Sequence, residues 1–381
     1  MPSILRDEIL KTSEVIVVKV GTNVLTHADG LLNERRIDRL TGDLRQMIAE
    51  KHRIVLVSSG AVGAGMGLLR LTERPAELAE LQAVAAVGQG KLIETYQQFL
   101  QPYGILAAQV LLTADDLSNR KLYLNARNAV RSILDFGALP IINENDTVST
   151  DELHTTFGDN DRLAALVANL FENPLLILLT DVDGLFDRDP AEAEAKLIPL
   201  VERWSPDLQK MVADKHSKRS KGGMSSKLKA AKMITESGGS VIIANGDKPE
   251  SLNSIFTGEE TGTLFLPHNT VLSARQRWLG FAVRTEGRLT VDDGAIQAMR
   301  QGKSLLSIGV LDAAGTFNKG GIVSVVNGSG DEVARGLTNY GIKDVLLIQG
   351  KRTNELYKVL GRTPYSEIIH HNNLIFINGN E

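Results

Sequence analysis

Several residues that could handle a phosphate group follow an apolar, strand-like run near the start of the chain. The run VIVVKV (15–20) contains Lys19, and Gly21, Thr22 and Asn23 come next. Glycine lets the backbone N–H groups of a turn approach an anion closely, and a lysine adds positive charge beside them. This stretch suits phosphate, although the same residues also fit a surface turn with a solvated lysine.

A second glycine-rich stretch, SKGGMSSKLKAA (220–231), opens a predicted helix. Lysine and glycine precede the helix start and a further lysine lies in its first turn, which together make a phosphate site. The candidate residues for nucleotide contact are Lys221, Gly222, Gly223, Met224, Ser225, Ser226 and Lys227. Neither a Walker A motif nor a G-x-G-x-x-G dinucleotide fingerprint follows any strand-like run, so phosphate binding here uses other parts.

Carboxylates and amides gather in two further stretches. PIINENDTV (140–148) supplies Asn143, Glu144, Asn145 and Asp146, and FGDNDRLAALVANLF (157–171) places Asp159, Asn160 and Asp161 ahead of a helical apolar pattern. One of these three would suffice as a helix N-cap. The remaining groups suit an ammonium ion, a hydroxyl-rich ligand or a metal, while turns and caps account for part of the set.

Two more strand ends carry polar residues. SSGAVGAGMG (58–67) places Ser58 and Ser59 before small residues, and LLTDVDGLF (178–186) places Thr180 and Asp181 after an apolar run. Small residues allow the backbone to approach a ligand, and they equally allow tight packing of a helix on a strand. Each stretch alone is weak, but their recurrence at successive strand ends favours a ligand site.

The elements that must position these residues alternate between strands and helices. Such alternation predicts an α/β fold with an open, mostly parallel sheet sandwiched by helices, and ligands of such sheets bind beyond the carboxyl ends of the strands. The predicted strands are 15–20, 53–60, 105–112, 138–143, 175–180 and 241–246.

Near residue 262 the residue pattern of the sequence changes to short apolar runs separated by glycine, asparagine and aspartate. We predict a first domain over 1–262, a linker over 263–284 and a small, mainly β domain over 285–381. Its expected antiparallel strands are KSLLSIGVL (303–311), GIVSVVN (321–327), DEVARGLTNY (331–340) and DVLLIQG (344–350), with a helix at DDGAIQAMRQG (292–302).

Composition excludes several classes of function. The 381 residues include no cysteine, which rules out disulfides and cysteine nucleophiles. The formal charge of −4 gives no global basic field that would attract nucleic acid. The first residues are charged throughout and no window is apolar enough to span a bilayer, so we expect a cytoplasmic protein with no membrane partner.

Taken together, these stretches resemble the amino-acid kinase family. The match consists of VVKVGTNVLT, VSSGAVGAG, PIINENDTV, FGDNDRLAALVA, LLTDVDGLF and GGMSSKLKAA, in that order. The paired NEND and GDND loops are similar to those of family members that phosphorylate the γ-carboxylate of glutamate, and LTVDDGAIQAMRQGKSLLSIGV, GTFNKGGIVSVV and ARGLTNY resemble a PUA domain. One departure is Ser220-Lys221, where the family usually has Gly-Thr.

The resemblance implies roles for the candidate residues. Lys19 and Lys227 are expected to stabilise the transferring phosphoryl group, with Asp161 fixing their ammonium groups. Ser59, Asp146 and Asn160 are expected to bind the amino-acid acceptor, and Asp159 to cap its helix or contact the acceptor's ammonium. The ATP-binding set is expected to be Lys19, Gly21, Thr180, Asp181 and the residues 221–227 named above.

The resemblance also implies partners. We expect ATP and L-glutamate as substrates, Mg²⁺ held mainly by the ATP phosphates and by no protein metal site, feedback inhibition by proline, and a homo-dimer or homo-tetramer. Regulation is expected at the loop STDELHTTF (149–157). Three alternatives remain open: a kinase of the same fold acting on another acid or on UMP, an RNA-binding protein through the PUA domain, and a non-catalytic sensor.

Overall fold

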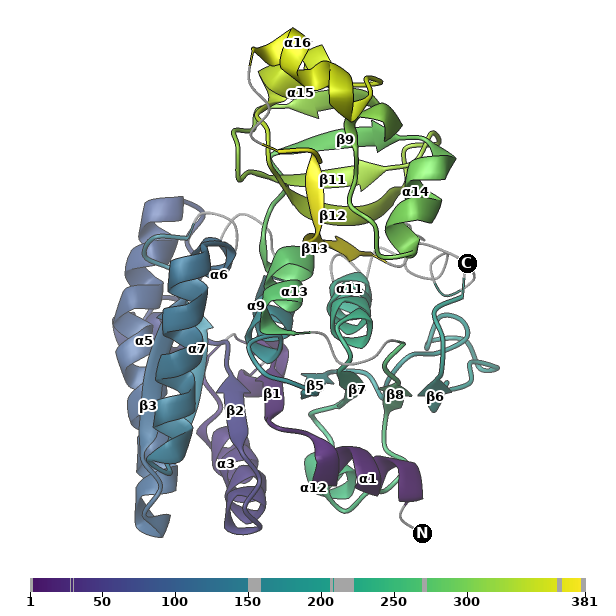
Figure 1. Ribbon diagram of the computed structural model, residues 1–381. Helices are drawn as coiled ribbons and strands as arrows, with labels where there is room; N and C mark the ends of the chain where they lie inside the picture. Colours follow the sequence, from purple (N-terminus) through teal and green to yellow (C-terminus); the bar gives the residue numbers. More distant parts are fainter. Residues whose placement is uncertain are drawn as a thin grey trace. The chain divides into compact units, whose positions relative to one another are not determined.

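Two compact units, residues 1–272 and 273–381, make up the chain (Figure 1). The computed structural model describes residues 3–27, 29, 31–149, 159–205, 208, 223–268, 273–361 and 365–377, with only the backbone at Asp159 and Ala274. The expected linker, 263–284, contains a strand of the first unit and a helix of the second.

An eight-stranded sheet forms the centre of the first unit, in the order β3-β4-β2-β1-β5-β7-β8-β6. The first six strands in this order, β3, β4, β2, β1, β5 and β7, run parallel to one another, and β8 runs antiparallel to β7. Every residue of β1, β2, β4 and β5 is buried because helices cover both faces. The predicted α/β sheet is therefore confirmed. The strands are β1 Ile16–Val20, β2 Ile54–Val57, β3 Ala107–Leu112, β4 Leu139–Glu144, β5 Leu175–Thr180, β6 Leu200–Val201, β7 Ser240–Asn245 and β8 Thr263–Phe265.

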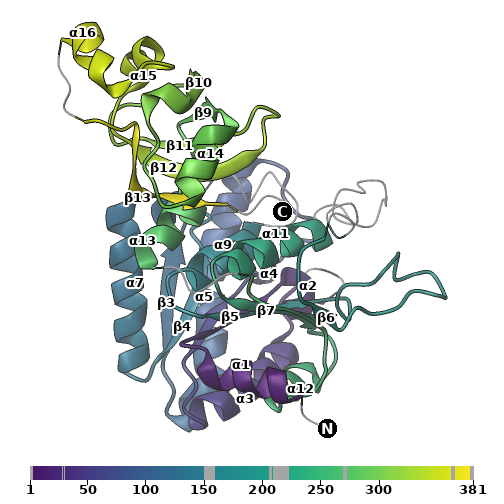
Figure 2. The same cartoon turned by 45° about the vertical axis from the view of Figure 1, so that its right-hand side comes forward.

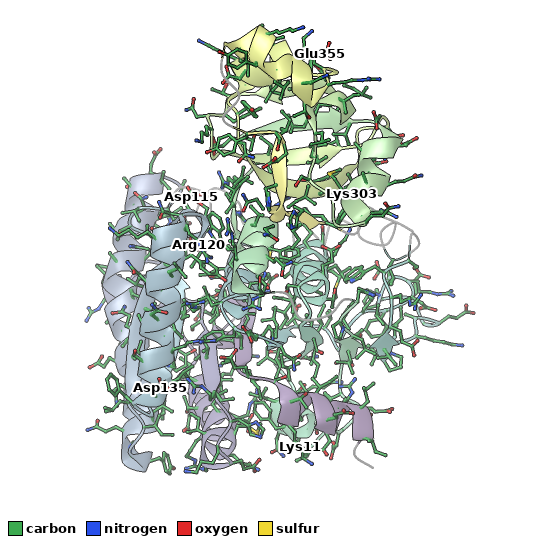
Figure 3. All side chains as sticks on the ribbon, viewed as in Figure 1. Lys11, Asp115, Arg120, Asp135, Lys303 and Glu355 are labelled. Atoms are coloured by element: carbon green, nitrogen blue, oxygen red, sulfur yellow. The ribbon has the colours of Figure 1, made fainter. Side chains whose placement is uncertain are left out.

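Helices lie on both sides of this sheet (Figure 2). α1, α3, α5 and α12 pack on one face, where they share an apolar core with alternate strand residues, and α7, α9 and α11 pack on the other. Apolar side chains fill the space between the layers, while charged residues such as Lys11 and Asp135 lie at the periphery (Figure 3). In the part of the chain that the structure describes, every helix is too short or too polar to cross a membrane. The helices are α1 Ile4–Thr12, α2 Thr22–Leu25, α3 Glu34–Ala49, α4 Ala61–Leu69, α5 Leu78–Leu100, α6 Ala114–Ser118, α7 Arg120–Asp135, α9 Asp159–Ala168, α11 Gly223–Glu236 and α12 Ser251–Phe256, with a 3₁₀ turn at Gln101–Tyr103.

Two glycines let α4 and α5 touch backbone to backbone. A Cβ atom on Gly88 of α5 would lie 1.9 Å from the carbonyl oxygen of Ala61, and one on Gly65 of α4 would lie 1.9 Å from that of Val84. Because Ala61 is the first residue of α4, this contact also fixes the turn that joins β2 to α4. The close approach therefore positions the polar residues at the end of β2.

The second unit contains a five-stranded sheet in the order β10-β9-β11-β12-β13. Its strands pair antiparallel except for β9 and β11, which run parallel. The strands are β9 Gly287–Val291, β10 Val310–Gly315, β11 Ile322–Val326, β12 Glu332–Thr338 and β13 Ile369–Phe376, and the helices are α13 Ala274–Arg277, α14 Asp293–Arg300, α15 Ile342–Ile348 and α16 Leu356–Leu360, with a π-helical turn at Trp278–Ala282 and 3₁₀ turns at Ser307–Gly309 and Thr353–Glu355.

Two sequence predictions in this unit are wrong. DVLLIQG forms part of α15, in which Val345 and Ile348 are buried while Leu346 and Leu347 are exposed, a three-residue spacing that a short apolar run hides. In KSLLSIGVL, residues 307–309 form a 3₁₀ turn and β10 begins only at Val310. The predicted helix at 292–302 is confirmed as α14.

The contact between α4 and α5 predicts opposite effects for two nearby glycines of α5. Gly88→Ala should lower the free energy of unfolding in urea by about 3 kcal/mol or more, because the new methyl group collides with backbone that cannot move aside. Gly90→Ala is the matched control. A Cβ there meets nothing within 4 Å, so the better helix propensity should stabilise by about 0.5–1 kcal/mol. Equal effects of the two substitutions would contradict this packing.

Candidate active site

Asp161 lies between two lysine ammonium groups at the carboxyl edge of the first unit's sheet. Lys19 comes from the central strand β1, Asp161 from the first turn of α9, and Lys227 from α11. Lys19 Nζ lies 2.7 Å from Asp161 Oδ1, and Lys227 Nζ lies 3.3 Å from Asp161 Oδ2. All three side chains are buried. One carboxylate therefore holds two cations, one at each of its oxygens.

The protonation of this cluster is set by a balance of burial and charge. Burial alone raises the pKa of Asp161, but the ammonium groups of Lys19 and Lys227 and hydrogen bonds from Lys19 and Ser226 outweigh it, so the pKa lies below its ordinary value. Burial lowers the pKa of Lys227, with Lys19 acting in the same direction and Asp161 opposing it. Asp161 is thus the main group that favours the charged form of Lys227, with a smaller contribution from Asp181.

The first turn of α11 adds two contacts to the cluster. Ser226 Oγ donates a hydrogen bond to Asp161 Oδ2 at 2.7 Å, and Lys227 Nζ donates to the carbonyl oxygen of Gly223 at 3.1 Å. Long side chains on a helix point toward its N-terminus, so Lys227 extends back along its own first turn. The ammonium group and the positive end of the helix dipole lie together, an arrangement suited to an anion.

On the other side of Asp161, the start of α9 contacts the turn that follows β2. Asn160 Nδ2 donates a hydrogen bond to Ser59 Oγ at 2.8 Å, and both side chains are buried. The neighbouring Ser58 Oγ shares a 2.8 Å hydrogen bond with the hydroxyl of Tyr96 on α5. Gly60 completes the turn at φ +101°, a conformation that favours glycine. These contacts hold an amide and a hydroxyl in one place.

The end of β4 and the turn after it lie against α5. Asn143 Nδ2 donates a hydrogen bond to Gln89 Oε1 at 2.8 Å. Asp146 lies in a turn closed by hydrogen bonds from the backbone N–H groups of residues 148 and 149 to the carbonyl oxygen of Asn145. Gln82 Nε2 donates to the carbonyl oxygen of Ser149 at 3.3 Å. Helix α5 therefore contacts both ends of the segment that carries Asp146.

The turn after β1 is held from two directions. The guanidinium group of Arg36 on α3 donates hydrogen bonds to the carbonyl oxygens of Asn23 and Val24 at 2.8 and 3.1 Å. The side chain of Asn23 donates to Asp181 Oδ2 at 3.5 Å, and Asp181 Oδ1 accepts a 3.0 Å hydrogen bond from the Thr180 hydroxyl. A Cβ on Gly21 would lie 3.4 Å from Lys19 Nζ, so glycine leaves room beside that ammonium group.

Most of the predicted site residues fall along this one edge of the sheet. The structure links by direct contacts Lys19, Asp161, Ser226, Lys227 and Gly223 in one group, Ser59 and Asn160 in a second, and Thr180 and Asp181 in a third. Met224 and Ser225 belong to the first turn of α11, and Asp146 lies in the turn after β4. Four parts of the predicted site lie outside the described residues: Lys221, Gly222, residues 150–157 of the proposed regulatory loop, and the side chain of Asp159.

Sequence reasoning missed four supporting side chains: Arg36, Gln82, Gln89 and Tyr96. Gln82 and Gln89 were visible as polar residues seven positions apart in an otherwise largely apolar helix, a spacing that puts them on one face. That pattern could have predicted contacts with a polar segment of the core. Arg36 gave no comparable signal, because arginine on an amphipathic helix is usually solvated.

Comparisons with known proteins match one family model within each of the two compact units. Residues 14–245 match the family model described as the Amino acid kinase family, and residues 287–360 match the PUA domain model.

Several proteins named glutamate 5-kinase are similar to the chain over nearly its whole length. The one from Caldanaerobacter subterraneus subsp. tengcongensis is 46% identical, covering 96% of this chain and 98% of its own. The one from Rhodopirellula baltica is 45% identical, covering 97% and 96%. The one from Geobacter sulfurreducens is 41% identical, covering 98% and 100%.

The buried cluster predicts an unusual pH dependence for Asp161→Asn. Removing the carboxylate leaves two buried ammonium groups without their counter-charge, which should lower the free energy of unfolding at pH 7 by about 3–5 kcal/mol. Without Asp161 the pKa of Lys227 falls further below its unfolded value, so the folded state binds fewer protons and stability should rise between pH 7 and 10. Urea unfolding at several pH values measures both effects.

Asp183→Asn is the control for that experiment, because this half-buried carboxylate pairs with the exposed Lys248 and accepts a hydrogen bond from Asn245. It should change stability by less than about 1 kcal/mol. If the stability of Asp161→Asn fell with rising pH instead, Lys227 would not be the group that this carboxylate keeps charged.

Proposed function

The chain belongs to the amino acid kinase family, and from that premise we propose that it transfers the γ-phosphoryl group of ATP to the side-chain carboxylate of L-glutamate. The products are ADP and L-glutamyl 5-phosphate, and the reaction is the first step of proline biosynthesis. The supporting observation is the carboxylate of Asp161, which holds two buried ammonium groups at the carboxyl edge of the sheet. The near full-length similarity to glutamate 5-kinases supports glutamate as the acceptor.

The chemistry explains why two cations and no strong base are needed. The γ-carboxylate of glutamate is already ionised at neutral pH, so one of its oxygens attacks the γ-phosphorus without losing a proton. A phosphorus–oxygen bond forms, the bond to the bridging β,γ oxygen breaks, and the electron pair leaves with ADP. The obstacle is repulsion between the carboxylate and the phosphates, and preorganised positive charge reduces it.

Lys19 and Lys227 supply that charge. They bind opposite oxygens of Asp161, and in this proposal they contact the transferring phosphoryl group from two sides. Lys227 also lies at the start of α11, where it contacts the phosphates of bound ATP. Asp161 is a positioning residue, since its contacts are with the lysines and Ser226 rather than with the reacting atoms.

The acceptor lies on the side of Asn160. The amide of Asn160 and the hydroxyl of Ser59, which are joined by a hydrogen bond, bind the α-carboxylate of glutamate. Asp146 binds the α-ammonium. Asp159 caps α9 or adds a second contact to the ammonium. ATP lies along Gly21, Thr180, Asp181 and the start of α11, with Lys221 and Gly222 ahead of that helix.

A divalent metal, Mg²⁺, accompanies ATP in this proposal. Mg²⁺ keeps several waters and is usually bound by substrate phosphates and one or two carboxylates. Both oxygens of Asp161 are occupied by ammonium and hydroxyl groups, whereas Asp181 is exposed and its hydrogen bonds within the described residues come from the neutral side chains of Asn23 and Thr180. Asp181 is therefore the carboxylate that fits beside the metal. Bound Mg²⁺ would neutralise phosphate charge.

Inhibition by proline, the homo-oligomer and the cytoplasmic location stay predictions from the sequence.

The reaction is tested by ADP release with Mg²⁺ and ATP, measured against glutamate, N-acetylglutamate, aspartate, carbamate and UMP. Hydroxylamine is present to trap any acyl phosphate. We expect glutamate-dependent turnover, formation of the γ-hydroxamate, and negligible turnover in excess EDTA. Turnover with a different acceptor would keep the kinase and overturn the substrate. Turnover with none of them would contradict the proposed function.

The two lysines are tested in the same assay. Lys19→Met and Lys227→Met should each lower kcat about 100-fold or more, as losing one preorganised transition-state charge does. Both variants should stay folded, because Asp161 keeps one ammonium partner. Lys229→Met, on an exposed position of α11, should have normal kcat. A variant of Lys19 or Lys227 with near-normal kcat would remove that lysine from the mechanism.

A further inference from the structure

We propose that Gln89 is a positioning residue for the acceptor, which it influences by holding the side chain of Asn143 and, with Gln82, the segment that carries Asp146. This inference rests on the proposed function, because it names a residue that determines how tightly the acceptor is bound. Neither glutamine contacts Lys19, Asp161 or Lys227 in the described structure.

The contact between Gln89 and Asn143 fixes the orientation of a buried amide. Gln89 is 8% exposed and Asn143 is 3% exposed, and the hydrogen bond between them is 2.8 Å long. Because Asn143 Nδ2 donates to Gln89 Oε1, the carbonyl oxygen of Asn143 is not the atom turned toward α5. A carbonyl oxygen three residues before Asp146 suits a cationic group, such as the α-ammonium of an amino acid.

Gln82 extends the same contact by two helical turns. Residues seven apart on a helix lie on one face, and the side chain of Gln82 donates to the carbonyl oxygen of Ser149. Asn143 precedes Asp146 by three residues and Ser149 follows it by three. The two glutamines therefore hold the segment at both ends, with Asp146 between them.

The helix that carries these glutamines is itself fixed. Gly88 touches the backbone of Ala61, directly after the turn that contains Ser59 and Gly60. The position of Gln89 relative to that turn is thus set by a backbone contact rather than by flexible side chains. α5 thereby relates the two segments proposed to bind the acceptor, the turn after β2 and the turn after β4.

A glutamine at position 89 would be an unfavourable choice if the side chain served only to fill space in the core. Its Nε2 atom is buried and has no hydrogen-bond partner among the described residues. Leaving a buried donor unpaired is unfavourable, and methionine would fill similar space without that cost. A glutamine at this position is therefore explained by its contact with Asn143 rather than by stability.

Gln89→Met tests the proposal against a matched control on the same helix, Gln97→Met. Gln97 is hydrogen-bonded too, but its two bonds reach the backbone of residues 105 and 107 at the start of the edge strand β3. We expect Gln89→Met to raise KM for glutamate about tenfold, the effect of losing one buried hydrogen bond, with KM for ATP changed less than about twofold. Gln97→Met should lower thermal stability and leave both KM values unchanged.

A double-mutant cycle tests whether Gln89 acts through Asn143. If it does, Gln89→Met combined with Asn143→Ala should have the same KM for glutamate as Asn143→Ala alone, because the partner is already gone. Two outcomes would overturn the inference while the unmodified chain still phosphorylates glutamate. One is a KM for glutamate in the double variant that rises by the product of the two single effects, and the other is an unchanged KM in Gln89→Met. If the unmodified chain uses another acceptor, the same cycle is read with that acceptor. If it uses none, the proposed function and this inference both fail.

Discussion

Two ammonium groups buried at the edge of one sheet require a counter-charge, and Asp161 provides it. The rest of the first unit follows from this requirement. β1 must end with Lys19 among buried strands, α9 must begin beside it, and α11 must turn its first residues inward so that Lys227 and Ser226 reach the same carboxylate. Helices on both faces exclude water from the strands, which strengthens every charge interaction in the cluster.

The segments proposed to bind the acceptor are positioned by close backbone packing and by hydrogen bonds between uncharged side chains. Gly65 and Gly88 allow α4 and α5 to meet backbone to backbone, so the turn after β2 and the polar face of α5 have a fixed relation. On that frame, hydrogen bonds join Asn160 to Ser59 and Asn143 to Gln89. These uncharged, tightly packed contacts adjoin the charged cluster of Lys19, Asp161 and Lys227.

The sequence was sufficient for the six parallel strands β3, β4, β2, β1, β5 and β7, but it missed β6 and β8 at the sheet edge. Strands buried on both faces are continuous apolar runs, and polar residues placed directly after such runs mark the ligand edge. It was insufficient where a local pattern has two solutions or where a contact joins distant segments. DVLLIQG fits a strand or a short helix equally well, and only the burial of Val345 and Ile348 distinguishes them. The hydrogen bond from Asn143 to Gln89 joins residues 54 positions apart, so no local spacing predicts it.

Asn160 and Asp161 are consecutive residues of a single helical turn, and a helix rotates by about 100° from one residue to the next. One side chain therefore points to Ser59 and the next to the lysines. Any shift of this turn that follows the arrival of an acceptor must also move the carboxylate that holds both cations. The hydrogen bond to Ser59 and the ion pairs with the lysines therefore depend on one turn of α9, so neither set of contacts can shift without the other.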